Sequence, residues 1–73
     1  MRNIVIDPEI CNGKPVIEGT RITAQTVIEF LSAGDSIEDV LEEYPTLTRE
    51  DVLACLAYSA RLMGQSINLQ AIG

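Results

Sequence analysis

The segment Asp7–Ile22 constrains the fold more than any other part of this chain, because it holds residues that neither a helix nor a central strand accommodates. Asn12-Gly13 readily supplies the two successive positive φ angles of a tight turn, and Glu18-Gly19 offers a second place for the chain to reverse. Pro8 and Pro15 each lack a backbone N–H, so neither belongs inside a central strand. We therefore predict a compact, turn-rich β element ahead of any helix.

The strands of this β element are expected to be short. Ile4-Val5-Ile6 is a β-branched run that predicts a strand, and the apolar pairs Ile10-Cys11 and Val16-Ile17 predict short edge strands beside the first turn. Lys14 and Arg21 lie next to the turns, where outward-facing N–H groups and cations together can hold an anion or an acidic partner. The alternative is that both cations are simply solvated.

Three helical segments follow the β element, and each has a recognisable start and stop. The first helix has Thr23 as its N-cap, the second starts at Ser36 and the third opens with Thr48. The stops are Gly34, Pro45 and Gly64. Asp51 stands in the capping-box position relative to Thr48. Apolar residues recur at helical spacing in every segment. The pattern predicts a mainly α fold, with a β element over residues 1–22, a three-helix core over 23–64 and an apolar tail over 65–73.

The second and third helices differ in their side chains. The polar side of the second helix is expected to be a solvent-facing acidic stripe made of Glu38, Asp39, Glu42 and Glu43. The third helix is expected to bury one broad apolar face made of Val52, Leu53, Leu56, Ala57 and Ala60. Cys55 falls on an apolar side of this helix and is expected to be a small core residue. The third helix is therefore the most clearly defined element of the sequence.

Length and composition indicate one small domain that hides its apolar residues with difficulty. With 73 residues, 47% of them hydrophobic, and a mean hydropathy of +0.18, the chain holds more apolar material than a small monomer readily buries. We therefore predict a single domain over residues 1–73 that assembles as a symmetric homodimer.

The residue inventory disfavours several classes of function. The sequence has no histidine and no Cys-x-x-Cys pair, so we expect no single-chain zinc site, no cofactor and no enzymatic activity. It contains no apolar run near the ~18 residues of a membrane span and no signal peptide, which predicts a cytoplasmic protein that does not bind membranes. The net charge of -6 disfavours non-specific binding to nucleic acid and favours a basic or mixed protein partner.

The C-terminal tail has the periodicity of a strand. Ile67, Leu69 and Ala71 alternate with polar residues. A tail with this pattern can add as a strand to a partner or pack into a groove on it. Ile67, Leu69 and Ile72 are therefore the candidate partner-binding residues.

Several motifs together resemble the small bacterial family called domain of unknown function 433. They are Asp7-Pro8-Glu9-Ile10-Cys11, Gly13-Lys14-Pro15-Val16-Ile17, Gly19-Thr20-Arg21-Ile22, Gly34, Tyr44-Pro45 and Thr48. The resemblance implies a helix-turn-helix-like, homeodomain-like core, a non-enzymatic antitoxin role and a PIN-like ribonuclease as partner, and it carries no catalytic residues. The chain departs from the family pattern at Asn12, where a second glycine is common, and at Glu18, where a basic residue is common.

Two functions follow from these observations. The first is an antitoxin-like homodimer that binds and restrains a PIN-like ribonuclease toxin, with regulation of its own operon as an added role. The alternative is a dimeric DNA-binding transcriptional regulator without a toxin partner. Contacts to operator DNA would come from Arg2, Lys14, Arg21 and Arg49. Arg49 is also expected to pair with Glu50 or Asp51, its neighbours in the first turn of the third helix.

Overall fold

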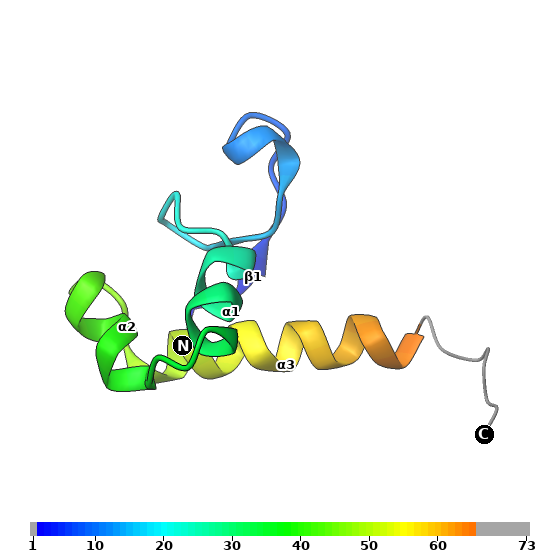
Figure 1. Ribbon diagram of the computed structural model, residues 1–73. Helices are drawn as coiled ribbons and strands as arrows, with labels where there is room; N and C mark the ends of the chain where they lie inside the picture. Colours follow the sequence, from blue (N-terminus) through cyan, green and yellow to red (C-terminus); the bar gives the residue numbers. More distant parts are fainter. Residues whose placement is uncertain (1, 66–73) are drawn as a thin grey trace, which may run out of the picture.

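The computed structural model describes residues 2–65, which form a small β element followed by three helices (Figure 1). The elements are β1 (Ile4–Val5), the 3-10 turn η1 (Cys11–Gly13), β2 (Val16–Ile17), α1 (Ala24–Ser32), α2 (Ile37–Glu43) and α3 (Arg49–Gln65). The predicted class, mainly α with a short N-terminal β hairpin and a three-helix core, is confirmed. None of the three helices is long and apolar enough to cross a membrane.

The β hairpin pairs different residues from those that the turn signals indicated. β1 runs antiparallel to β2, with Ile4 opposite Ile17 and Val5 opposite Val16. The predicted strand at Ile10-Cys11 is wrong. Cys11, Asn12 and Gly13 have φ angles of 52°, 56° and 78°, so the chain coils there in a left-handed turn, whereas a strand needs φ near −120°. The predicted positive φ angles at Asn12-Gly13 are confirmed, but the turn begins one residue earlier.

The second turn places β2 in the interior. Gly19 has a φ of 82°, and the N–H of Ile17 donates to the carbonyl of Ile22 at 3.0 Å after the chain has reversed. β2 therefore has β1 on one side and the segment Ile22-Thr23 on the other, joined by an isolated bridge between Val16 and Thr23. The prediction of an edge strand at Val16-Ile17 is wrong for this reason, and both side chains are buried.

The helix starts follow their predicted caps. The backbone N–H of Thr26 donates to the Thr23 hydroxyl at 3.1 Å, and Ser36 begins α2 with a full capping box. The N–H of Thr48 donates to Oδ2 of Asp51 at 2.9 Å, and the N–H of Asp51 donates to the Thr48 hydroxyl at 3.3 Å. The predicted end at Gly64 is wrong by one residue, because α3 runs to Gln65. A glycine inside a helix costs only about 1 kcal/mol relative to alanine, so Gly64 does not stop the helix.

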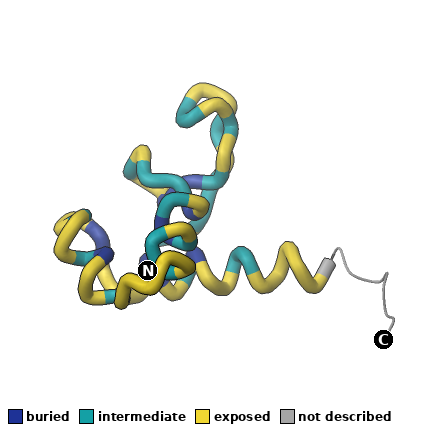
Figure 2. The backbone as a smooth tube through the Cα atoms, in the orientation of Figure 1, coloured by how far each residue is buried: buried dark blue, intermediate teal, exposed yellow. Residues whose placement is uncertain are grey.

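The core lies where β2, α1, α2 and the first half of α3 meet (Figure 2). Its buried residues are Ile17, Ala24, Val27, Val40, Leu47, Val52 and Cys55. Phe30 of α1 meets Tyr44, which follows α2, edge to face, with ring centroids 5.8 Å apart. The second half of α3 extends past the other described elements and is mostly exposed (Figures 1 and 2). The helical core therefore covers only one end of its longest helix.

Candidate interaction surfaces

The side chain of Arg2 is bound at the start of α3. Its Nη2 donates to Oδ2 of Asp51 at 2.8 Å and to the carbonyl of Thr46 at 2.7 Å. Asp51 is only 1% exposed and also accepts the N–H of Thr48. The first predicted DNA contact is therefore a cation already paired with a buried carboxylate.

The surroundings of Asp51 stabilise its charged form. Burial raises the pKa of this carboxyl, but the N–H of Thr48 and the guanidinium of Arg2 outweigh burial and bring the pKa below its ordinary value of 3.8. Asp51 is therefore ionised near neutral pH. Its negative charge caps the start of α3 and binds Arg2, which precedes β1.

Arg49 reaches across to α2. Its Nη1 lies 3.1 Å from Oε2 of Glu38, and both side chains are largely exposed. The expected pairing of Arg49 with Glu50 or Asp51 is wrong, because Asp51 points into the protein and is taken by Arg2. An exposed pair of this kind contributes at most about 1 kcal/mol to stability. Among the candidate DNA contacts, Arg49 is thus the second that lies beside a carboxylate.

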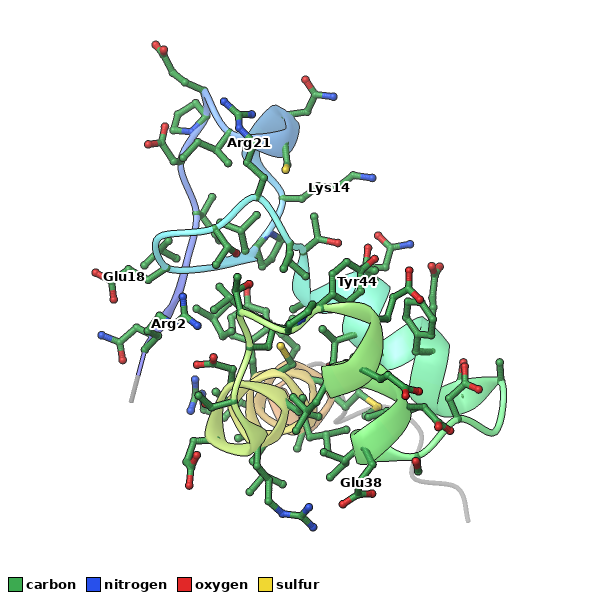
Figure 3. All side chains as sticks on the ribbon, turned by 90° about the vertical axis from the view of Figure 1, so that its left-hand side faces the viewer. Arg2, Lys14, Glu18, Arg21, Glu38 and Tyr44 are labelled. Carbon is green, nitrogen blue, oxygen red and sulfur yellow. The ribbon has the colours of Figure 1, made fainter. Side chains whose placement is uncertain are left out.

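Lys14 and Arg21 lie together at the outer end of the β element, apart from Arg2 (Figure 3). Both are exposed. A polar hollow of about 370 Å³ beside Lys14 is lined by residues of η1 and the first turns of α1, including Cys11 and Glu29. The four candidate DNA contacts are therefore not gathered on one surface. The candidate partner contacts Ile67, Leu69 and Ile72 lie outside the described residues.

The two thiols differ in environment. Cys11 is partly exposed, and its Sγ donates to the carbonyl of Arg21 at 3.3 Å. Cys55 is buried, as predicted, and burial together with the nearby charge of Asp51 raises the pKa of its thiol to about 11.

We expect a thiol reagent at pH 8 to modify Cys11 in the folded protein and to reach Cys55 only on unfolding. Only about one Cys55 thiol in a thousand is ionised at that pH, and the side chain has no exposed surface. Ellman's reagent should count one fast thiol in buffer and two in denaturant. Cys11→Ser should remove the fast reaction, and two thiols reacting equally fast in buffer would contradict this assignment.

The acidic stripe of α2 faces solvent. Glu38, Asp39, Glu42 and Glu43 are all exposed, and within residues 2–65 Glu38 alone among them has a basic partner. Asp39 accepts the N–H of Ser36 in the capping box. Like charges four residues apart on a helix cost about 0.2–0.5 kcal/mol per pair. Apart from Glu38, the stripe is therefore a surface of negative charge without a basic partner among residues 2–65.

α3 has two apolar sides, which the sequence had suggested were one. Val52 and Cys55 are fully buried, whereas Leu53 is 44% exposed and Leu56 is 39% exposed. Ala57 and Ala60 are also exposed. The prediction that all these residues form one buried face is wrong. The sequence does not separate the exposed side from the buried side, because the residues on both are apolar.

No metal cluster is present in the described part of the chain: no three His, Cys, Asp or Glu side chains between residues 2 and 65 are grouped so that they could hold a metal ion.

Comparison with known proteins places this small three-helix domain in a family. The chain matches the family described as "Protein of unknown function (DUF433)" over residues 4–59, and it belongs to that family. It is 34% identical over 56 residues to the uncharacterized protein y4eO of Sinorhizobium fredii, covering 77% of this chain and 25% of the relative. It also resembles the crystal structure of a DUF433 member from Anabaena variabilis, with a TM-score of 0.80 and 32% identity.

That similarity covers 89% of this chain and 64% of the Anabaena chain. The chain thus spans a quarter of the Sinorhizobium relative and less than two thirds of the Anabaena protein. The match confirms the resemblance that the N-terminal motifs indicated. The family is described as one of unknown function. Membership therefore indicates the fold, and a function has to be inferred from the surfaces of the molecule.

Proposed function

We propose that this protein is a non-enzymatic, antitoxin-like interaction module that binds and restrains a PIN-like ribonuclease toxin. The observation that supports this proposal is the exposed acidic stripe of α2, made of Glu38, Asp39, Glu42 and Glu43. A nuclease that acts on RNA presents cations to phosphates, and a carboxylate surface competes for the same cations. A basic partner would also relieve the repulsion between like charges along α2.

Several polar groups around the helical core have structural roles. Ser36, Thr48 and Asp51 cap helices, and Arg2 is bound to Asp51. The sequence contains no histidine, the most common general acid and base in enzymes. These assignments support a binding function over a catalytic one, and the solvent-facing side of α2 is the surface that we propose for the partner.

The alternative, a DNA-binding regulator, receives less support from the same geometry. Arg2 and Arg49 are paired with carboxylates, and Glu50 lies beside Arg49 in the first turn of α3. Among residues 2–65, Lys14 and Arg21 are the exposed candidate contacts that form no ion pair with a carboxylate. Since non-specific affinity for DNA grows with the number of phosphates neutralised, regulation of the operon would depend on these two cations from each copy.

Reversing charge on α2 should weaken binding to the nuclease. We expect Glu42→Lys with Glu43→Lys to slow association on the order of tenfold at low salt, and the difference should shrink as salt is added. The measurement is the association rate with the purified PIN-like nuclease encoded nearest to this gene, together with inhibition of its ribonuclease activity.

The matched control reverses two exposed acids away from α2, Glu9 and Glu29. This control has the same net charge as the α2 variant and should bind almost as well as the unaltered protein. Equal slowing by both variants would assign the effect to net charge and not to the stripe. A nuclease that keeps full activity at a stoichiometric excess of this protein would refute restraint.

A further inference from the structure

The middle of α3 presents an apolar strip to solvent, here called the outer face of α3. It consists of Leu53, Leu56, Ala57 and Ala60. These positions follow the i, i+3, i+4, i+7 spacing of a single helix side, so they form one strip about 10 Å long. Val52 and Cys55 on the other side of α3 already fill the core. The core therefore does not explain why the outer face is apolar.

Charge along the sequence makes this strip the place where two copies can meet with the least repulsion. The chain carries a net charge of -6, and all eleven acidic residues lie at or before Asp51. Between Val52 and Gln65 the only charged residue is Arg61. Two copies approaching along any other helix would bring acidic side chains together, whereas the outer face of α3 carries none.

The outer face is self-complementary when two copies of α3 run antiparallel. Its large residues, Leu53 and Leu56, come first, and its small ones, Ala57 and Ala60, come last. A two-fold axis between Leu56 and Ala57 sets Leu53 against Ala60 of the second copy and Leu56 against Ala57 of the second copy. Each large side chain then meets a small one, which is the arrangement that lets helix surfaces interlock.

The same antiparallel arrangement is favourable for charge. It brings Arg61 within about one helical turn of Glu50 of the second copy, on the 5.4 Å pitch of an α-helix. It also opposes the two helix dipoles. A parallel pair would instead set Arg61 against Arg61 and Glu50 against Glu50. Charge therefore selects the antiparallel orientation.

A groove next to the outer face offers further apolar surface to a second helix. It has a volume of about 670 Å³ and lies between β1 and α3. Its lining includes Ile4 and Val5 from β1, and Leu53, Ala57 and Tyr58 from α3. Stable interfaces bury about 800 Å² on each partner, more than four side chains supply. The groove extends the contact from α3 onto β1.

We propose that the outer face of α3 is the interface of a homodimer, in which the α3 helices of two copies pack antiparallel about a two-fold axis between Leu56 and Ala57. This inference goes beyond the proposed function and does not depend on it. The dimer uses the apolar side of α3, and the acidic stripe of α2 stays available to another partner.

Sedimentation equilibrium of the full chain over a range of concentrations tests the interface. The unaltered protein should sediment as a dimer of 8.0 kDa chains. Ala57→Glu should raise the dimer dissociation constant at least about tenfold, because it sets two carboxylates near the axis. Ala33→Glu is the matched control, since Ala33 is exposed at the end of α1, and it should leave the dimer intact. Circular dichroism checks that both variants are folded.

A mixture of charge variants gives a sharper test. Ala57→Glu and Ala57→Lys should each be monomeric alone and should form a mixed dimer when combined, because opposite charges then meet near the axis. A monomeric unaltered protein at all concentrations would overturn the proposal and leave the outer face to a different occupant. A dimer that survives Ala57→Glu, or that Ala33→Glu disrupts equally, would also overturn it.

Discussion

Replacing Asp51 by alanine is expected to lower the free energy of unfolding by about 2–4 kcal/mol. The change removes the capping box of α3, which contributes about 0.5–2 kcal/mol, and charge-assisted hydrogen bonds worth about 1.5–3 kcal/mol. It also leaves the guanidinium of Arg2, whose side chain is 35% exposed, without its carboxylate. A domain of this size has only about 4–11 kcal/mol in total, so the loss is large. Urea unfolding followed by circular dichroism measures it.

Glu50→Ala is the matched control, because Glu50 is exposed and precedes Asp51 in the same helical turn. It should change stability by less than about 0.5 kcal/mol. Since the folded pKa of Asp51 is lowered, its contribution is complete above its ordinary value of 3.8 and is lost as pH falls through the lowered pKa. The loss of stability in acid should therefore be shallower in Asp51→Ala. Equal stability of Asp51→Ala and Glu50→Ala would contradict the role assigned to the buried carboxylate.

Ile17→Ala should lower the free energy of unfolding about as much as Asp51→Ala, but for a different reason. Ile17 has no exposed surface and belongs to β2, which contacts both β1 and the segment Ile22-Thr23. Truncating a buried isoleucine to alanine costs about 2–5 kcal/mol, because transfer free energy is lost and a cavity is left. The melting temperature should fall by about 10 °C or more.

The same truncation at an exposed isoleucine is the control, because it separates the effect of burial from the effect of removing an isoleucine side chain. Ile6 follows β1 and is 60% exposed, so Ile6→Ala should shift the melting temperature by only a few degrees, about one quarter of the Ile17 effect or less. Comparable shifts in the two variants would show that β2 is not the central element of the β region.

The features that could be predicted from sequence are those set by neighbouring residues. Thr23, Ser36 and the pair Thr48 and Asp51 each satisfy backbone groups within three residues, so their cap chemistry is visible in the sequence. Asn12-Gly13 adopts positive φ for an equally local reason. The helix count and the starts of the helices follow from such signals.

The features that escaped prediction depend on residues far apart in the chain. The partner of β2 is decided by which strand reaches it, and Ile4 to Ile17 is not a local pairing. Arg2 and Asp51 are 49 positions apart, and no spacing rule connects them. The exposed side of α3 could not be separated from its core side, because both are apolar. The carboxylate partners of the candidate contacts Arg2 and Arg49 could therefore not be predicted from the sequence.

The pairing of Arg2 with Asp51 and Thr46 joins the residues before β1 to the start of α3. Because Asp51 also caps α3, release of residue 2 and unwinding of the first turn of α3 are coupled events. Loss of the Arg2 contact would therefore weaken the attachment of the N-terminal residues and the cap of α3 together. A contact that spans 49 positions of the sequence thus helps to hold the N-terminal strand β1 beside α3.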